Sequence, residues 1–339
     1  MSTLDFTLGR HEVNLSAPFI TALRSVEKYT VITYTLSDGS GVSGVGEAVA
    51  TPAIVGDSLD EINADLSEVI TPALADIKDL EEALTILAPL HVTPSSKAAA
   101  DMAVHTFFAA EAGISLSTLL GSKVERIKTD VTVPISSIDQ LDQIVRDRVD
   151  QGFTSLKIKL RAISLSENIL IMQKIRELAK PGISLRVDPN QAWDYEYAKD
   201  FLIALDKLDI LIDYLEQPVG RDNIDDLARL SGLGLAPIMA DESLFSMSDL
   251  EEIIDKQASS WVNVKILKSG GIAPARAIAD VALASGLNVS IGSMMEGERG
   301  VQAAAFLASA IAPGVTHDLD AAWWHRDSSL RYSNGELAL

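Results

Sequence analysis

The sequence predicts a two-domain α/β protein, in which an α+β domain over residues 1–120 precedes a modified (β/α)8-type barrel. From about residue 129 onward, short apolar runs typical of strands alternate with amphipathic helical stretches. This alternation indicates a parallel sheet, and the large number of strand–helix units predicts that the sheet closes into a barrel. We expect the barrel over residues 121–315. The last barrel strand and a segment that returns to the first domain are expected over residues 316–339.

The first domain shows the signals of an antiparallel meander followed by helices. Runs rich in β-branched residues predict strands at 4–15, 29–36 and 42–49. The segment Ser16–Lys28, which contains Pro18 and Arg24, is expected to be a loop. Apolar residues at near-helical spacing predict helices at 57–75, 79–88 and 95–112.

Strand-like runs separated by helical stretches make up the predicted barrel. The expected strands are 130–135, 154–160, 184–189, 211–216, 237–241, 261–266, 288–292 and 315–319. Amphipathic periodicity predicts helices between them, for example at 166–180 and 194–207. Gly270-Gly271 is interpreted as the turn into the next helix, because the sequence contains neither of the common glycine-rich phosphate-binding motifs.

The composition excludes several classes of protein. The chain has 339 residues and a formal net charge of −20, with 48 acidic and 28 basic residues. This acidity argues against nucleic acid or an anionic membrane surface as a partner, since both require a basic face. There are no cysteines, so disulfides and thiolate sites are excluded, and a metal would need oxygen or imidazole ligands.

No targeting or membrane signal is visible in the sequence. The first residues show no basic region followed by an apolar run, which argues against a signal peptide. The longest apolar stretch, near 301–311, is shorter than the roughly 20 residues of a membrane span. We therefore expect a cytoplasmic protein, and assembly into a homo-oligomer is compatible with the sequence.

Three carboxylates end consecutive strand-like runs of the predicted barrel: Asp188, Glu216 and Asp241. Strand ends converge at the mouth of a barrel, so these side chains are expected to meet there. Crowded carboxylates repel one another unless a cation lies among them, and hard oxygen ligands favour Mg²⁺ or Mn²⁺. Each residue alone could equally be a helix cap or a surface acid. The three together predict a metal site.

Lysines share the same predicted mouth. Lys157 and Lys159 are two residues apart on one strand, so both face the same side, and Lys265 is expected to approach from the opposite wall. Adjacent ammonium groups and a nearby cation should lower a lysine pKa towards about 7 to 8, which suits a general base. Lys268 is instead expected to be a surface lysine whose aliphatic stem packs on apolar neighbours.

Two bases that face each other across a metal predict a proton-transfer reaction. One lysine could remove the α-proton of a carboxylate substrate, and the other could return a proton to the opposite face. The metal would stabilise the enediolate that forms between these two steps. A metal-stabilised enediolate combined with a lysine base is described for sites of the enolase superfamily.

The charged motif resembles a known family. Lys157-x-Lys159, Asp188, Glu216, Asp241 and Lys265, in this order and spacing, resemble the muconate-lactonising-enzyme subgroup of the enolase superfamily. The resemblance covers nearly the full chain and implies an enolase-like fold, with a capping domain before a TIM-like barrel. It further implies that Lys159 and Lys265 are the acid/base catalysts, and that Lys157 tunes Lys159 and helps to bind the substrate carboxylate.

Two later segments resemble dipeptide epimerases, which belong to that subgroup. They are Gly292-Ser293-Met294-Met295-Glu296 and Asp318-Leu319-Asp320. The resemblance implies that Asp318 and Asp320 hold the α-ammonium of a dipeptide. It places Arg24 where L-Ala-D/L-Glu epimerases carry an arginine that grips the side-chain carboxylate of glutamate. Further substrate contacts are expected from Ser293, Met294 and Glu296.

The expected activity is inversion of the C-terminal residue of a dipeptide by 1,1-proton transfer. L-Ala-D/L-Glu, a fragment of cell-wall peptide, is the expected substrate. The alternatives are an o-succinylbenzoate synthase, an N-acylamino acid racemase, or a dipeptide epimerase that prefers basic or apolar dipeptides. The charged segment 296–299 and the Ala-Ala-Trp-Trp run after Asp320 depart from the usual pattern. Both departures bear on the identity of the dipeptide and leave the chemistry unchanged.

Overall fold

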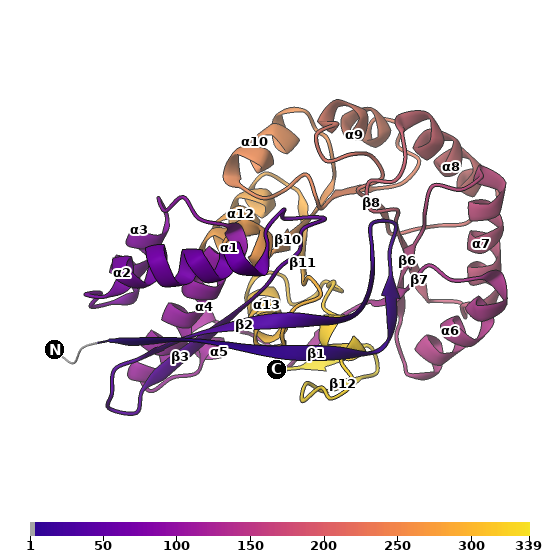
Figure 1. Ribbon diagram of the computed structural model, residues 1–339. Helices are drawn as coiled ribbons and strands as arrows, with labels where there is room; N and C mark the ends of the chain where they lie inside the picture. Colours follow the sequence, from indigo (N-terminus) through magenta and orange to yellow (C-terminus); the bar gives the residue numbers. More distant parts are fainter. Residues whose placement is uncertain (1–3) are drawn as a thin grey trace.

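A long antiparallel ribbon dominates the capping domain of the computed structural model, which describes residues 4–339. Its strands, in sheet order, are β1 (Asp5–Ile20), β2 (Ser25–Ser37) and β3 (Ser43–Val49). The β1–β2 ribbon runs from the capping helices across to the region of β6 in the barrel (Figure 1). The capping domain therefore reaches over the second part of the chain.

The segment 16–28 is mostly strand, so the expectation of a loop there is wrong. After an irregularity in the pairing, β1 and β2 pair again at Phe19 and Ile20, and only residues 21–24 form the turn between them. The residue just before this segment is supported from far along the chain, because Leu15 forms a bridge with His325. No local pattern in the sequence indicates such a distant partner.

Helices pack on the capping sheet and confirm the predicted helical stretches. They are α1 (Leu59–Ala64), a π-helical turn (Asp65–Ile70), α2 (Thr71–Leu74), α3 (Leu80–Leu87), α4 (Pro94–Glu111) and α5 (Leu116–Leu120). Helix α4 lies so close to β3 that a Cβ atom on Gly46 would lie 1.8 Å from the carbonyl oxygen of Ala99. Glycine is therefore required at this position by the approach of the two backbones.

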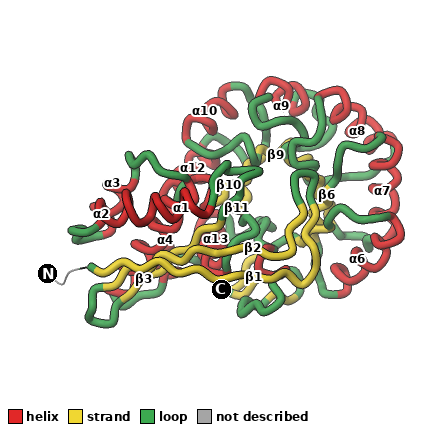
Figure 2. Tube along the Cα trace, viewed as in Figure 1, coloured by secondary structure: helices red, strands yellow, loops and turns green. Residues whose placement is uncertain are grey.

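A curled parallel sheet forms the barrel (Figure 2). Its seven strands lie in chain order: β5 (Val131–Val133), β6 (Ser155–Lys159), β7 (Ser184–Asp188), β8 (Tyr214–Glu216), β9 (Ile238–Ala240), β10 (Trp261–Lys265) and β11 (Asn288–Gly292). The accompanying helices are α6 (Ile138–Asp150), α7 (Leu165–Leu178), α8 (Tyr195–Lys207), α9 (Ile224–Ser231), α10 (Met247–Asp255), α11 (Ile266–Ser269), α12 (Ile272–Ala284) and α13 (Glu298–Ile311). This arrangement confirms the predicted barrel. None of the helices within residues 4–339 has the length and apolar character needed to cross a membrane.

Gly270 and Gly271 form the predicted turn between α11 and α12. Gly270 ends α11 with a φ of +82°, a left-handed conformation that glycine adopts without strain. This confirms the interpretation of the pair as a turn.

The eighth predicted strand, 315–319, is not a strand. Isolated bridges take its place, one of them between Gly292 and Asp318. The imidazole of His317 also contributes, because its Nδ1 accepts a hydrogen bond of 3.0 Å from the amide of Ile291. A side chain thus satisfies a main-chain donor of β11, and the ring closes without a regular ladder.

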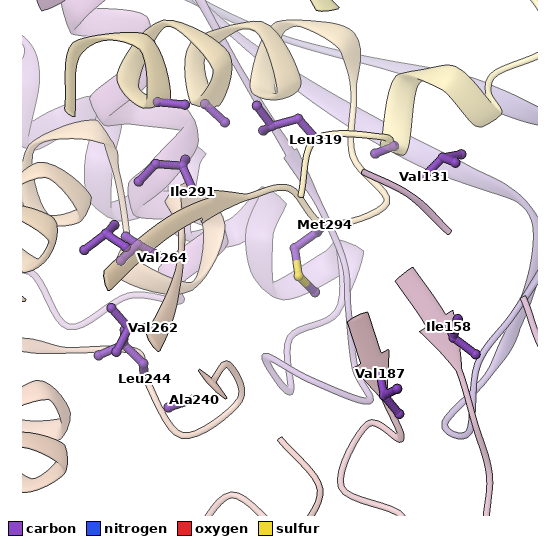
Figure 3. Close-up of a cluster of buried hydrophobic side chains, with 14 of the residues drawn as sticks. Val131, Ile158, Val187, Ala240, Leu244, Val262, Val264, Ile291, Met294 and Leu319 are labelled. Carbon is purple, nitrogen blue, oxygen red and sulfur yellow. The ribbon is translucent and has the colours of Figure 1, made fainter. Parts of the chain in front are cut away.

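Alternation along the barrel strands separates apolar from charged side chains. Ile158, Val187 and Val264 point away from the middle of the ring, whereas Met294 lies within it (Figure 3). Successive residues of a strand face opposite sides, so the residues next to these apolar side chains point inward. The strands therefore deliver lysines and carboxylates to the interior at the barrel mouth.

The C-terminal segment returns to the beginning of the barrel and to the capping domain. A 3₁₀ turn, η2 (Ala321–Trp324), precedes β12 (Tyr332–Ser333) and β13 (Glu336–Ala338), and β13 pairs with β4 (Arg126–Lys128). The amide of Arg326 donates a hydrogen bond of 2.9 Å to the carbonyl of Asn14 on β1. This segment therefore supports the strand that leads to the hairpin turn at residues 21–24.

Candidate active site

A cavity of about 50 Å³ lies between the hairpin turn and the ends of the barrel strands. It has room for about one or two water molecules, so a larger ligand requires the hairpin or the lining side chains to move. The sequence-predicted residues that line it are Arg24, Lys157, Lys159, Asp241, Lys265, Ser293, Met294, Asp318 and Asp320.

Three of the predicted site residues do not line the cavity. Asp188 and Glu216 are fully buried behind it. Glu296 is turned aside, because its Oε1 accepts a hydrogen bond of 2.8 Å from the amide of Met294. Burial raises the pKa of Glu296 to about 8. Glu296 therefore shapes the loop after β11 rather than facing the cavity.

Each of the three predicted metal ligands is paired with a lysine. The distances from lysine Nζ to carboxylate oxygen are 2.5 Å for Lys159–Asp188, 2.9 Å for Lys157–Glu216 and 2.8 Å for Lys265–Asp241. Strand register explains the first pair, because Lys159 lies directly opposite Asp188 in the β6–β7 ladder. Neighbouring strands therefore place opposite charges at one level of the barrel.

Nearby carboxylates favour the charged form of two of these lysines. Burial opposes the charged form of Lys157, but Asp318 and Glu216 outweigh burial and raise the pKa of Lys157. Burial likewise opposes the charge of Lys265, and Asp241 leads the carboxylates that raise its pKa. Among the protein's own groups, the pKa of Lys157 is therefore raised, whereas the sequence analysis expected crowding and a nearby cation to lower the pKa of one lysine of the Lys157–Lys159 pair. A bound cation among the carboxylates would oppose this effect.

The carboxylates suit a hard divalent cation in their donor chemistry. Lysines separate them, and no three acidic or histidine side chains within residues 4–339 form a ready metal cluster. Burial nevertheless raises the pKa of Glu216 to about 7. The Oε2 atom of Glu242, which follows Asp241, is buried and has no hydrogen-bond partner among the described residues. Buried carboxylate oxygens that are short of positive charge are donors that Mg²⁺ accepts.

Lys268 is buried, so the expectation of a surface lysine is wrong. It is 1% exposed, and its Nζ lies 2.6 Å from Oδ1 of Asp241. The chain enters α11 directly after Lys265, which brings Lys268 round by one helical turn to the same carboxylate. Burial raises the pKa of Asp241, but the charges of Lys265 and Lys268 outweigh it and hold this pKa well below its usual range.

Asn263 is a site residue that the sequence analysis did not identify. Its Nδ2 donates to Glu216 Oε1 at 3.0 Å and to Asp318 Oδ2 at 2.9 Å. Asn263 is therefore a link between a predicted metal ligand and the last barrel segment. Its position two residues before Lys265 was a usable signal, because alternate residues of a strand share a face.

Asn190 links the predicted metal ligand Asp188 to Glu242, and the sequence analysis identified neither Asn190 nor Glu242. Asn190 Nδ2 lies 3.3 Å from Asp188 Oδ2 and 3.2 Å from Glu242 Oε1, and it donates to both. Burial raises the pKa of Glu242 to about 8. The only sequence signal for Glu242 is that it follows Asp241 directly.

Arg24 sits in the hairpin turn, where burial lowers the pKa of its guanidinium. No carboxylate within residues 4–339 is among the groups that shift this pKa. Its neighbours in the cavity lining include the apolar side chains of Phe19, Leu23 and Ile54. A partly buried guanidinium among apolar residues is suited to an anionic group of a ligand.

Comparison with known proteins establishes the family. Residues 140–339 match the family described as Enolase C-terminal domain-like, and residues 5–121 match Mandelate racemase / muconate lactonizing enzyme, N-terminal domain. The chain therefore belongs to the mandelate racemase/muconate lactonizing enzyme family of the enolase superfamily. This confirms the family predicted from the lysine and carboxylate motif.

Similar proteins within this family include dipeptide epimerases. The L-Ala-D/L-Glu epimerase of Francisella tularensis subsp. novicida (strain U112) is 33% identical over 316 residues, which cover 92% of this chain and 88% of that protein. The substrate-liganded L-Ala-D/L-Glu epimerase from Bacillus subtilis matches with a TM-score of 0.95 and 31% identity, covering 100% of this chain and 96% of that one. A dipeptide epimerase from Methylococcus capsulatus, complexed with Mg and L-Arg-D-Lys, matches with a TM-score of 0.90 and 27% identity, covering 100% and 97%. Epimerases are isomerases, so these similarities confirm the expectation that this chain is an isomerase.

Proposed function

We propose that this protein is a Mg²⁺-dependent dipeptide epimerase that inverts the C-terminal residue of L-Ala-D/L-Glu. The observation that carries the proposal is that Lys159 and Lys265 line one cavity from strands on opposite sides of the barrel. Strands β7, β8 and β9 separate β6 from β10, so the two ammonium groups approach a ligand from different walls. Such an arrangement suits removal of a proton from one face of a carbon atom and its return to the other face.

In this scheme the two lysines exchange roles according to the substrate enantiomer. One lysine, as the free amine, takes the α-proton of the C-terminal residue onto Nζ. The other, as the ammonium, delivers a proton to the opposite face of the same carbon. Lys157, which lies two residues before Lys159, would remain charged and would orient the substrate carboxylate and Lys159.

The predicted metal ligands are Asp188, Glu216 and Asp241. A bound Mg²⁺ would attract the substrate carboxylate and would make the α-proton more acidic by stabilising negative charge. Its own charge would also weaken the hold of these carboxylates on the lysines, which favours the free amine that a base requires. The M. capsulatus relative, which is complexed with Mg and a dipeptide, supports Mg²⁺ as the metal.

Charge complementarity supports an acidic second residue in the dipeptide. Arg24 has no acidic partner among the described residues and lies in the cavity lining, where a glutamate side chain could pair with it bidentately. Asp318 and Asp320, in the last barrel segment, supply the negative charge for the α-ammonium of the first residue. A dipeptide with an ammonium at one end and an extra carboxylate at the other matches this distribution.

A deuterium-exchange screen tests the proposal. The protein with Mg²⁺ is incubated in D₂O with pooled L-Ala-L-Xaa dipeptides, and the mass of each dipeptide is followed. We expect a gain of one mass unit confined to L-Ala-L-Glu, and no gain with the Lys159→Ala/Lys265→Ala double variant as the control. Gain on basic or apolar dipeptides would retain the mechanism and overturn the substrate. No gain on any dipeptide would overturn the proposed function.

A further inference from the structure

We infer that Gln217 is a positioning residue of the predicted metal site, and that it fixes the main chain beside two of the ligands, Glu216 and Asp241. This inference rests on the proposed function, which assigns these carboxylates to Mg²⁺, and deepens it. Gln217 directly follows Glu216 at the end of β8.

The main chain of Gln217 adopts a conformation that residues other than glycine rarely take. Its φ is +35°, in the left-handed region, and the residue is completely buried. Its amide donates a hydrogen bond of 2.9 Å to the carbonyl of Met239, and its carbonyl accepts one of 2.8 Å from the amide of Gln191. Met239 lies on β9, and Gln191 lies in the loop that follows Asp188. The turn after Glu216 is therefore held by the ends of both neighbouring strands.

The side chain of Gln217 uses its full hydrogen-bonding capacity within the protein. Oε1 accepts hydrogen bonds of 3.0 Å from the amides of Asp241 and Ser243. Nε2 donates to the Ser243 hydroxyl at 2.8 Å and to the Val219 carbonyl at 3.2 Å. A primary amide offers two acceptor positions and two donor hydrogens, and all four are used here. Gln217 therefore has no free group for a metal or a substrate, and it acts by positioning its neighbours.

Gln217 takes the place of a strand neighbour for Asp241. The β8–β9 ladder ends with the pair Glu216 and Met239, and the β9–β10 ladder ends at Ala240. Asp241 lies just beyond both ladders, and its amide donates to the Gln217 side chain instead of a strand carbonyl. A side chain anchored directly after Glu216 thus fixes the main chain of Asp241.

The spacing of two carboxylate ligands matters for a small cation. Mg²⁺ requires nearly octahedral geometry with oxygen ligands at about 2.0–2.1 Å, so ligands that move apart bind it less tightly. Without Gln217, the buried amides of Asp241 and Ser243 would lose their acceptor, and the segment after β9 would have to move to satisfy them. Replacement of a residue that orients metal ligands typically costs about tenfold to a hundredfold in metal affinity.

Asn168 on α7 provides a matched control outside the metal site. It is also completely buried, and its Nδ2 donates to the carbonyl of Arg161 at 2.9 Å and to the hydroxyl of Tyr197 at 2.7 Å. Neither hydrogen bond involves a predicted metal ligand. Replacement of Asn168 therefore removes a buried amide of the same kind without releasing Glu216 or Asp241.

The test compares Gln217→Met with Asn168→Leu in binding of Mn²⁺, measured by electron paramagnetic resonance without dipeptide, after thermal melting has shown that both variants fold. We expect Gln217→Met to raise the Kd for Mn²⁺ about tenfold to a hundredfold, because Asp241 loses the acceptor that fixes it. Asn168→Leu should lower the Tm and keep the Kd within about twofold of the wild-type value. Equal Kd values for the two variants would overturn the inference.

A second pair of variants keeps the test decisive if Gln217→Met fails to fold. Ser243→Ala removes a hydroxyl that accepts from Gln217 and donates to the Arg221 carbonyl at 2.7 Å. It should raise the Kd for Mn²⁺ about threefold, since the Gln217 side chain loses one of its four hydrogen bonds. Ser259→Ala, at a buried serine before β10, is the control and should leave the Kd unchanged. Equal Kd values for Ser243→Ala and Ser259→Ala would overturn the inference.

The inference and the proposed function can fail separately. Wild-type protein that binds Mn²⁺ but exchanges no dipeptide α-proton would overturn the proposed function. A Gln217→Met variant that loses exchange but keeps the wild-type Kd for Mn²⁺ would overturn the inference alone.

Discussion

The hydroxyl of Tyr29 lies 2.6 Å from Nε2 of His325 and donates a hydrogen bond of 2.8 Å to the carbonyl of Glu296. Because the hydroxyl carries a single proton, Nε2 of His325 must carry a hydrogen and donate it to the tyrosine oxygen. Tyr29 is on β2, His325 follows η2, and Glu296 is in the loop after β11. One side chain therefore joins the three chain segments that surround the cavity.

Replacement of Tyr29 by phenylalanine should loosen this junction. We expect Tyr29→Phe to raise KM for the dipeptide about fivefold to tenfold with a smaller change in kcat, because the hairpin that carries Arg24 loses two of its hydrogen bonds. Steady-state kinetics checks the result. Tyr34→Phe is the control, since the Tyr34 hydroxyl forms its hydrogen bond within the capping domain, with Thr71 at 3.0 Å. Equal KM values for the two variants would contradict the assigned role.

Single lysine variants should separate the two half-reactions. We expect Lys159→Ala or Lys265→Ala to reduce epimerisation by at least about 10²-fold, because each removes one acid/base group. Each variant should still exchange the α-proton of one substrate enantiomer, since one base remains. Deuterium incorporation from separate L-Ala-L-Glu and L-Ala-D-Glu samples, followed by NMR, measures this. Normal turnover in either variant would exclude the two-lysine scheme.

Replacement of Arg24 should affect acidic dipeptides selectively. We expect Arg24→Met to lower kcat/KM for L-Ala-L-Glu by about tenfold to a hundredfold, because a charge-assisted hydrogen bond is lost. The value for L-Ala-L-Gln should change little, so the preference for glutamate should disappear. Arg229→Met on α9, in a surface ion pair with Asp226, is the control. An equal loss of kcat/KM for both dipeptides would indicate that Arg24 maintains the structure of the hairpin and does not bind the glutamate carboxylate.

Loss of Lys268 should destabilise the protein and strengthen metal binding. Lys268→Met leaves Asp241 with one lysine fewer, and breaking such a buried pair costs about 3 kcal/mol or more of unfolding free energy. Urea unfolding in EDTA measures this cost. The cost should be smaller with saturating Mg²⁺, because a cation on Asp241 replaces the missing charge.

The control for Lys268 is Lys256→Met, at the C-terminal cap of α10. Lys256 is in a surface pair with Asp225 at 2.8 Å, and its loss should leave the unfolding free energy almost unchanged. A cost for Lys268→Met that is the same with and without Mg²⁺ would contradict the proposed link between Lys268 and the metal site.

His317 should contribute to acid sensitivity. Burial lowers its pKa to about 4, whereas the unfolded chain binds the proton at about pH 6.5. Between these values the unfolded state holds more protons, so the unfolding free energy falls as the pH is lowered from about 6.5 to 4, by up to about 3 kcal/mol. In His317→Asn this part of the pH dependence should disappear, because the amide oxygen can still accept from Ile291 without titrating.

Urea unfolding at a series of pH values measures the effect of His317→Asn. The exposed His91, replaced in the same way, is the control for the loss of a histidine from the surface. A wild-type slope in His317→Asn would show that other groups cause the acid sensitivity.

The barrel and the central charges could be predicted because their signals are local. Strand and helix periodicities differ, and several strand-like runs end on or next to a charged residue such as Lys159 or Asp188. Strand ends in a parallel barrel meet by geometry, so the ordering of these residues already implied that they converge. The hairpin around Arg24 was predicted less well, because its strands depend on Leu15 pairing with His325 near the other end of the chain.

The sequence by itself determined the fold class, the family and the inward-facing lysines and carboxylates, since strand alternation and spacing are properties of neighbouring residues. Only the tertiary structure decided what each charged group touches. It buried Lys268 against Asp241 and placed Asn263 between Glu216 and Asp318. It also brought the indole of Trp324 to Asp320, which accepts its hydrogen bond. The physical reason is that charge, burial and hydrogen bonding depend on distances between residues that the chain brings together from remote positions.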